Sequence, residues 1–246
     1  MEEGVLKPQM IARPIEGFPK VVIGCFHQRF IDIASRRFAL KKETAIFAGA
    51  PYPVYSLDWQ GQKLGLFLSC EGSMAAAVFM EELIAHGAKG FVYFGSCGSL
   101  DSRATHNTLI VPTHAYCDEG VALHYGQEEK WIANPCASML SQMLSRMFLP
   151  RVEGKVWTTS APYRELPSTI KSLKAQGCIA VDMECASLIA VAAFRSVPCL
   201  QFLYSEDKLD GPQWDQGTLG SMKADSASKF LEIALQTAEN LNSILN

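Results

Sequence analysis

Residues 91–99 of the chain read Phe91-Val92-Tyr93-Phe94-Gly95-Ser96-Cys97-Gly98-Ser99, so that large apolar side chains are followed directly by small ones. The apolar run predicts a buried strand, and the small residues predict a glycine-rich turn over 95–99. Backbone N–H groups in such a turn can approach an anion or a sugar oxygen closely. A purely structural turn explains the same residues, because glycine commonly follows a strand.

On either side of this segment, short apolar runs alternate with longer segments of helical period. We expect strands at 21–25, 54–59, 64–70, 90–94, 108–112, 154–158, 179–181 and 199–204, with a hairpin around Gln60-Gly61-Gln62. We expect helices at 29–40, 73–86, 137–147, 168–176, 184–194 and 221–245. Neither a linker nor a repeat of about 20 to 50 residues interrupts the alternation. The pattern predicts one α/β domain over residues 1–246, with a mixed central sheet flanked by helices.

Composition excludes several classes of protein. The 246 residues are 48% apolar, and 22 basic against 25 acidic residues leave a net charge of −3, too balanced for a broad nucleic-acid-binding face. Apolar runs fall far short of the roughly 20 residues that span a membrane. The acidic start, Met1-Glu2-Glu3, differs from a secretory signal, so we expect a cytosolic protein.

The cysteines and histidines lack the spacings of known metal and disulfide frameworks. No Cys-x-x-Cys pair occurs among the eight cysteines, and the five histidines lack the i, i+4 spacing of a helical metal site. We therefore expect buried thiols and no metal.

Two acids lie where a short buried strand is expected to run into an apolar helix, in the segment Val181-Asp182-Met183-Glu184. Ligands of open α/β sheets bind beyond the carboxyl ends of the strands, which makes such junctions candidate sites. A buried Glu184 carboxylate needs a partner, and a polyhydroxylated ligand could supply one. A helix N-terminal acid favoured by the helix dipole is the structural alternative.

A second acidic cluster, Glu206-Asp207, is expected directly after the strand that ends at Tyr204. Neighbouring carboxyl groups raise the pKa of one of the two, which suits an acid that protonates a leaving heterocycle. A solvated loop explains the same composition.

An aromatic ring and a guanidinium, those of Tyr163 and Arg164, follow another expected strand, in the segment Thr158-Thr159-Ser160-Ala161-Pro162-Tyr163-Arg164-Glu165. Such a pair suits a planar ligand, although surface packing explains it equally well. Arg29, early in the first expected helix, is a candidate anion clamp, while an exposed helix arginine is the commoner case.

Taken together and in this order, these segments resemble the nucleoside phosphorylase/nucleosidase family, which holds hexameric purine nucleoside phosphorylases, uridine phosphorylases and methylthioadenosine/S-adenosylhomocysteine nucleosidases. The likeness covers most of the chain. Its most specific parts are residues 81–88 leading to Phe94-Gly95-Ser96-Cys97-Gly98, then Val181-Asp182-Met183-Glu184, then Glu206-Asp207. The resemblance implies a nucleoside phosphorylase-like fold and cleavage of a nucleoside N-glycosidic bond through an oxocarbenium-like transition state.

The resemblance also assigns roles to the acids. It implies that Met183 and Glu184 hold the ribose, with Glu184 on its hydroxyls, where a carboxylate also favours developing positive charge. Asp207 is then the acid that protonates or hydrogen-bonds the departing base. The family has a Ser-Asp pair at this point, which can be matched to Glu206-Asp207 or to Ser205-Glu206. In the second match Glu206 is the acid; we prefer Asp207.

The base and the nucleophile have implied sites as well. The segment Pro162-Tyr163-Arg164 falls where the family stacks on and recognises the base. Arg29, Gly95 and Ser96 fall where phosphorylases hold phosphate, which is their co-substrate, and no further cofactor is implied.

The chain departs from the family pattern at the expected phosphate site. Tyr93 stands where phosphorylases usually place an arginine, and Cys25-Phe26-His27-Gln28 replaces their Gly-Asp-Pro turn. No arginine lies between Arg37 and Arg103, and no histidine precedes Phe26, so the groups that many members lend to a neighbouring subunit are not apparent. The phosphate site is therefore depleted.

We expect an enzyme that cleaves a purine or pyrimidine nucleoside, with phosphorolysis ahead of hydrolysis because Arg29 and Ser96 are retained. A hydrolytic nucleosidase is the alternative that Tyr93 favours. A nucleoside-binding protein with weak or no catalysis is a third, because a shared fold does not guarantee a shared activity. The resemblance implies a homo-oligomer, a dimer or hexamer, with neither nucleic acid nor a membrane as partner.

Overall fold

The computed structural model describes residues 4–211 and 213–246, so the acidic start Met1–Glu3 and Pro212 lie outside the described residues. Its strands are β1 (Val21–Cys25), β2 (Lys41–Phe47), β3 (Pro51–Trp59), β4 (Gln62–Leu68), β5 (Gly90–Ser99), β6 (Leu109–Asp118), β7 (Trp131–Ala133), β8 (Arg151–Thr159), β9 (Cys178–Asp182) and β10 (Cys199–Lys208). Its helices are α1 (Pro8–Ile11), α2 (Gln28–Arg37), α3 (Ser73–His86), α4 (Val121–His124), α5 (Ala137–Arg146), α6 (Pro167–Ala175), α7 (Cys185–Arg195) and α8 (Ala224–Leu245), with a short 3-10 helix η1 (Pro162–Arg164).

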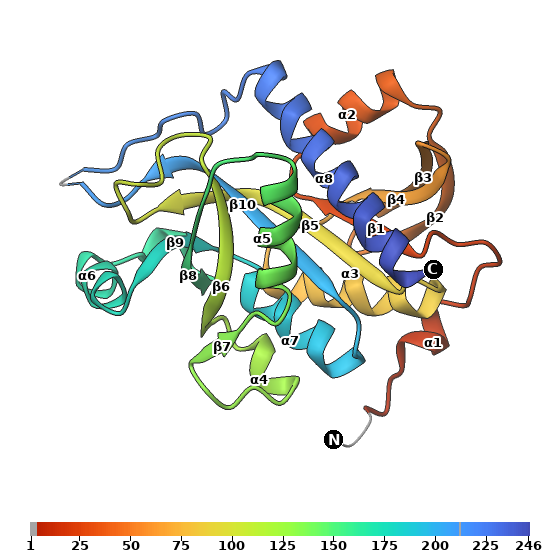
Figure 1. The fold of residues 1–246 in the computed structure, drawn as a ribbon. Coiled ribbons are helices and arrows are strands. Elements are labelled where there is room, and N and C mark those ends of the chain that lie inside the picture. Colours follow the sequence, from red (N-terminus) through yellow and green to blue (C-terminus); the bar gives the residue numbers. More distant parts are fainter. Residues whose placement is uncertain (1–3, 212) are drawn as a thin grey trace.

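The strands form one mixed sheet in the order β10-β6-β8-β9-β5-β1-β4-β3-β2, with β7 on the edge of β6 (Figure 1). β5 is the central strand, because it pairs in parallel with both β1 and β10 and antiparallel with β9. Its pairing with β10 closes a ring of five strands, β5, β10, β6, β8 and β9. The expectation of a mixed central sheet flanked by helices is confirmed.

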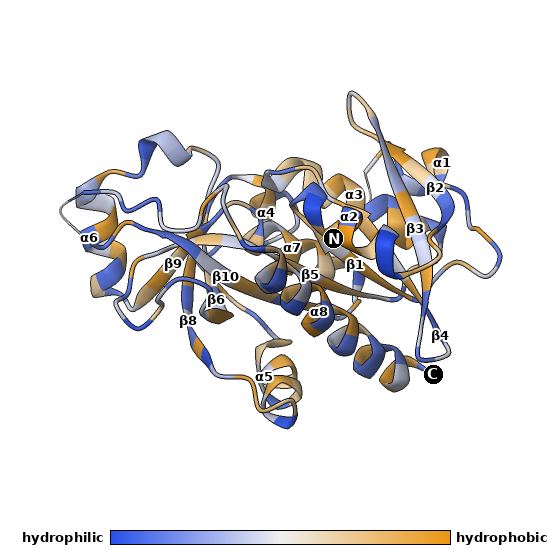
Figure 2. Cartoon of the chain, turned by 90° about the horizontal axis from the view of Figure 1, so that it is seen from above, coloured by the Kyte–Doolittle hydropathy of each residue, from blue (hydrophilic) through white to orange (hydrophobic). Residues whose placement is uncertain are grey.

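Helices cover both faces of the sheet, with α5 and α8 on one side of β1 and β5 and α3 and α7 on the other (Figure 2). Alternate residues of β5 pack against the helices on opposite faces of the sheet, since successive side chains of a strand point to opposite faces. Val92 and Phe94 pack with residues of α2, α5 and α8, whereas Phe91 and Tyr93 pack with residues of α3 and α7. Within the described residues, no helix is both long and apolar enough to span a bilayer.

The regular apolar patterns are the best-predicted parts of the fold. Helix α3 has the bounds expected from the sequence, and Gly87 ends it with a φ of 125°, a conformation that favours glycine. The helix expected over 29–40 ends earlier, at Arg37, and the one expected from Ser221 begins at Ala224. The sequence reasoning missed β2 and β7.

The predicted glycine-rich turn is wrong, because residues 95–99 continue β5 as paired strand. Gly95 is small for a different reason, since a Cβ there would lie 2.9 Å from Cδ2 of Phe26. β10 likewise does not end at Tyr204 but continues to Lys208, which places Glu206 and Asp207 in a strand and not in a solvated loop. Residues 95–99 and the pair Glu206-Asp207 are therefore parts of strands and not of loops.

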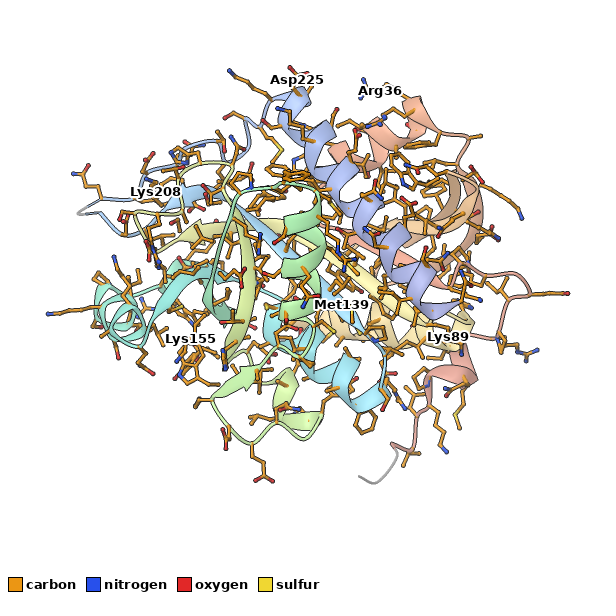
Figure 3. The ribbon with its side chains drawn as sticks, viewed as in Figure 1. Arg36, Lys89, Met139, Lys155, Lys208 and Asp225 are labelled. Atoms are coloured by element: carbon orange, nitrogen blue, oxygen red, sulfur yellow. The ribbon has the colours of Figure 1, made fainter. Side chains whose placement is uncertain are left out.

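The carboxyl ends of β5 and β10 lie at one end of the molecule. Figure 3 shows Lys208, the last residue of β10, on the opposite side from Lys89, which precedes β5. This end of the sheet is where ligands of α/β proteins bind.

Candidate active site

Strands β9 and β10 meet β5 at residues 97–99. β10 pairs Ser205 with Cys97 and Asp207 with Gly98, and β9 pairs Val181 with Gly98. These pairings bring together two acidic segments that are separated by more than twenty positions in the sequence.

The charges of three carboxyl groups act on the buried thiol of Cys97. Burial raises the pKa of this thiol well above its ordinary value, and the charges of Asp182, Asp207 and Glu206 raise it further. The two acidic segments therefore lie at the same end of β5.

A β-bulge directs Glu206 and Asp207 to different neighbours. Ser205 and Asp207 pair with successive residues of β5, so that Glu206 is the extra residue between them. A bulge re-aims the side chains beside it. Glu206 faces Ser96 and Arg29, whereas Asp207 faces Trp214 and Glu165.

Glu206 lies among the groups that were expected to hold phosphate. Its side chain is 5% exposed, and the Ser96 hydroxyl donates a hydrogen bond to its carboxylate. Burial raises the pKa of Glu206, the neighbouring Asp207 adds to the rise, and Ser96 and Arg29 oppose it. Arg29, held in the first turn of α2 by the His27 cap, therefore already faces a carboxylate of this chain. A cavity of about 10 Å³, room for about one water molecule, adjoins Arg29 and Glu206.

Aromatic rings cover the other side of β5 at this point. Phe26 approaches Gly95 and stacks on Tyr93, with ring centroids 6.0 Å apart. Tyr93 faces the α3–α7 layer, and its buried hydroxyl has no hydrogen-bond partner among the described residues. Ser96 is the one exposed residue of β5. Of the expected phosphate groups, Ser96 and Arg29 thus come together, while a ring covers Gly95.

Asp207 is partly buried and lies near a second acid, Glu165. The indole N–H of Trp214 donates to Oδ2 of Asp207 at 2.7 Å. Burial raises the pKa of Asp207, and the Trp214 hydrogen bond opposes the rise. Burial and the charge of Asp207 also raise the pKa of Glu165 to about 7. The pair is suited to holding a proton at neutral pH.

The two acids at the junction after β9, Asp182 and Glu184, have different hydrogen-bond partners. Asp182 is the helix cap, because Oδ2 accepts the N–H groups of Glu184 and Cys185 at 3.0 and 2.7 Å, and Oδ1 accepts the Thr158 hydroxyl at 2.7 Å. Glu184 is free of capping and instead accepts the N–H of Gly72 at 2.6 Å. The structural alternative for this acid, a helix N-terminal role, is therefore taken by Asp182.

Glu184 is a strongly perturbed acid. Its side chain is 9% exposed, and burial, with the charge of Asp182, raises the pKa of Glu184 to about 8. The start of α3 closes against it, since the Ser73 hydroxyl donates to the carbonyl of Met183 at 2.7 Å. A ligand with several hydroxyl groups would supply further hydrogen-bond donors to this buried carboxylate.

We expect Asp182→Ala to lower the free energy of unfolding by about 3 kcal/mol or more, because it leaves two backbone N–H groups and a hydroxyl buried without an acceptor. Urea unfolding followed by circular dichroism measures the loss. Thr158→Val is the milder comparison, since it orphans the Ala186 N–H but keeps the Asp182 cap. An unfolding midpoint of Asp182→Ala equal to wild type would contradict the capping role.

The expected base-binding segment lies at the rim of this site. Pro162, Tyr163 and Arg164 form η1, and the Tyr163 side chain is 99% exposed, with no ring contact or side-chain hydrogen bond to any described residue. Glu165, the next residue, turns inward toward Asp207. The structure therefore brings Glu165, and not the Tyr163 ring, to the acids.

Sequence reasoning missed Glu165, Gly72 and Ser73 as site residues. Glu165 is the last residue of the singled-out segment 158–165, but no role was assigned to it. The contacts of Gly72 and Ser73 with residues more than a hundred positions away have no local signal. In the described residues, no cluster of three or more potential metal ligands occurs.

Comparisons with known proteins relate the chain to one family. A family model described as the phosphorylase superfamily matches residues 19–245. The DeoD-type purine nucleoside phosphorylase of Jannaschia sp. (strain CCS1) is 25% identical over 198 residues, which cover 73% of this chain and 77% of that protein. An uncharacterised protein of Acanthamoeba polyphaga mimivirus is 27% identical over 142 residues, and the match spans 56% of this chain and about half, 54%, of the viral protein.

A solved structure extends the likeness to almost the whole chain. Purine nucleoside phosphorylase from Toxoplasma gondii, in complex with immucillin-H, superposes with a TM-score of 0.74 over 98% of both chains, at 18% identity. That likeness shows the fold, and the family match adds the sequence relation and confirms the resemblance found in the motifs. The chain belongs to the phosphorylase superfamily.

Proposed function

We propose that this protein cleaves the N-glycosidic bond of purine nucleosides, with inorganic phosphate as the nucleophile and free base and ribose 1-phosphate as products. The observation that carries the proposal is that Asp182, Glu206 and Asp207 lie at the same end of β5, where the charges of all three act on Cys97 and that of Asp182 acts on Glu184. Relatives named as purine nucleoside phosphorylases support the purine base and the phosphate.

The neighbours of each acid support its role. Glu184, with Met183, binds the ribose hydroxyls, and its charge stabilises the positive charge that develops on the sugar. Asp207 is the acid for the leaving base, because its pKa is raised and it lies beside Glu165 and away from Arg29. Pro162, Tyr163 and Arg164 form the rim over which the base enters. No cofactor takes part.

Arg29, Ser96 and the N–H of Gly95 are the proposed phosphate ligands. They form a weaker anion site than usual, since Glu206 repels a phosphate dianion and Phe26 covers Gly95.

The surroundings of Glu206 favour a second candidate function, hydrolysis. A buried carboxylate with a raised pKa, held by Ser96 beside a cavity the size of one water molecule, has the character of a general base. In this reaction Glu206 takes the proton from water, and water attacks the ribosyl carbon in place of phosphate.

Glu206→Gln separates the two candidates. For phosphorolysis, removing the negative charge is expected to lower the KM for phosphate about tenfold, because the repulsion within a partly buried site disappears. For hydrolysis, the same change is expected to slow base release without phosphate about 100-fold, because the general base is lost. Base release from adenosine, guanosine and inosine is measured spectrophotometrically in phosphate-free buffer and over a phosphate series.

The wild type provides the reference for both outcomes. Base release that requires phosphate, with a lower KM for phosphate in Glu206→Gln, supports phosphorolysis. Base release that needs no phosphate and is much slower in Glu206→Gln supports hydrolysis. Absence of release from every nucleoside, with or without phosphate, would contradict nucleoside cleavage itself.

We include a homo-oligomer in the proposal. Exposed apolar side chains on α1 and α3, at Met10, Ile11, Met74 and Val78, form a surface that a second copy of the chain can cover.

A further inference from the structure

Residues 209–211 and 213–221, here called the strap, lie back across the end of β10. Lys208 and Asp215 exchange both backbone hydrogen bonds, at 2.8 and 3.0 Å. Thr218 donates its N–H to the carbonyl of Glu206 at 2.9 Å, and the ring Nδ1 of His106 lies 3.1 Å from the same oxygen. The strap is therefore attached to the backbone on both sides of Asp207.

Within the strap, Trp214 is the side chain that reaches the proposed acid. Its Nε1 lies 2.7 Å from Oδ2 of Asp207, within the range of hydrogen bonds to charged acceptors. Its ring is nevertheless 56% exposed. Because about half of Trp214 is exposed, burial of its ring does not account for its position, and the hydrogen bond to Asp207 does.

The chemistry of indole decides how Asp207 can carry a proton. An indole N–H is a donor without acceptor capacity, so the oxygen it contacts must act as an acceptor. In a protonated carboxyl the carbonyl oxygen is a stronger acceptor than the hydroxyl oxygen, so the Trp214 bond to Oδ2 favours Oδ1 as the oxygen that carries the proton. Oδ1 lies over β5, 3.5 Å from where a Cβ on Gly98 would be.

We propose that Trp214 is a positioning residue that reserves Oδ2 of Asp207 for its own N–H and so aims the protonated Oδ1 at the departing base. The inference rests on the proposed function. As the C1′–N9 bond breaks, its electron pair passes into the purine, and N7 takes the proton from Oδ1. Asp207 is left as a carboxylate whose Oδ2 keeps the Trp214 hydrogen bond, and the incoming nucleophile captures the ribosyl cation.

Such a role has a pH signature with a definite sign. The Trp214 hydrogen bond favours the ionised form of Asp207, so its removal raises the pKa of Asp207. The falling limb of kcat/KM, where Asp207 loses its proton, then moves to higher pH even though the maximal rate is lower. The other titratable groups that face Asp207 are Glu206, Glu165, His106, Asp215 and Cys97, and Trp214→Phe leaves all five in place.

The test compares two purine nucleosides in Trp214→Phe, which keeps an aromatic ring and loses the N–H. With inosine, we expect kcat/KM to fall about 10- to 100-fold, because proton delivery is misaimed. With N7-methylinosine, whose base leaves without needing a proton, we expect a change of no more than about twofold, since no proton delivery remains to be lost.

Trp59→Phe is the matched control, because its indole N–H also donates to a carboxylate, Oε2 of Glu239, at 3.2 Å and at a distance from the site. It is expected to cleave both nucleosides as wild type does. Equal losses with inosine and N7-methylinosine in Trp214→Phe, or an unmoved pH limb, would overturn the positioning role. Failure of the proposed function is a separate result, since wild type itself would then release base from neither nucleoside.

Discussion

Asp207→Asn is expected to slow release of base from purine nucleosides about 100- to 10,000-fold, the usual contribution of a positioned general acid. Asparagine keeps the shape of the side chain and can still accept the Trp214 indole N–H, but it has no acidic proton. Because the loss is of an interaction made in the transition state, it is expected in kcat, with KM for the nucleoside nearly unchanged. Base release followed by absorbance over a nucleoside concentration series separates the two constants.

The same variant is expected to be more stable than wild type at neutral pH. Burial raises the pKa of Asp207 in the folded protein, so the folded state binds its proton more tightly than the unfolded chain does. Asp207 therefore does not reduce the free energy of unfolding at low pH. The free energy of unfolding falls as the pH rises through the pKa values that Asp207 has in the unfolded and folded states. A neutral amide does not pay this cost, so Asp207→Asn should unfold at higher urea concentration than wild type at pH 7.

Asp225→Asn is the control for the charge change, because Asp225 is an exposed acid in the first turn of α8 and not in β10 (Figure 3). Its base release should match that of wild type. An Asp207→Asn protein that is folded and still releases base at the wild-type rate would show that another group, Glu165 or Glu206, protonates the base.

How far the sequence predicts this fold depends on how regular each pattern is. Helix α3 was predicted with its observed bounds because apolar residues recur at helical spacing and Gly87 ends it, although two of those residues, Met74 and Val78, are exposed. β2 was missed because most of its side chains are exposed or only partly buried, so the strand has no apolar run to detect.

The ends of the central strands depend on partners that local patterns do not reveal. The small residues 95–99 favour a turn when taken alone, and they become strand only because β10 and β9 pair with them. The bulge at Glu206 follows from the same pairing. Its effect, which separates two adjacent carboxylates into different surroundings, could not be read from Glu206-Asp207 in sequence.

The candidate site was predictable where it depends on strand ends and not where it depends on contacts across the fold. Glu184 and Asp207 were singled out because acids at such junctions are costly unless they bind something. The cover of Phe26 over Gly95 and the Trp214 contact with Asp207 involve loops, whose course is set by tertiary packing.

Glu184→Gln is expected to lower kcat/KM for a purine nucleoside about 100-fold or more, with most of the loss in kcat. Glutamine keeps the length of the side chain and an oxygen for the Gly72 N–H, so the site is expected to fold as in wild type. It removes the negative charge that lies beside the developing ribosyl cation, where little water screens it.

The pH dependence gives this prediction its sharpest form. The pKa of Glu184 is raised to about 8 in the free protein, so the productive carboxylate increases as the pH rises through 8, and kcat/KM should rise with it. Ribose hydroxyls that donate to the carboxylate favour its ionised form, so the corresponding limb of kcat should lie at lower pH. Glu184→Gln should lack both rising limbs.

Glu71→Gln provides the matched test of this assignment, because Glu71 is an exposed acid whose charge contributes to the raised pKa of Glu184. Removing that charge should move the rising limb of kcat/KM to lower pH without a large loss of maximal rate. If Glu184→Gln kept a rising limb near pH 8, the limb would belong to another group, with Glu165 at about 7 the nearest candidate. If Glu71→Gln left the limb unmoved while Glu184→Gln removed it, Glu184 would still be the titrating group, and burial together with Asp182 would account for its raised pKa.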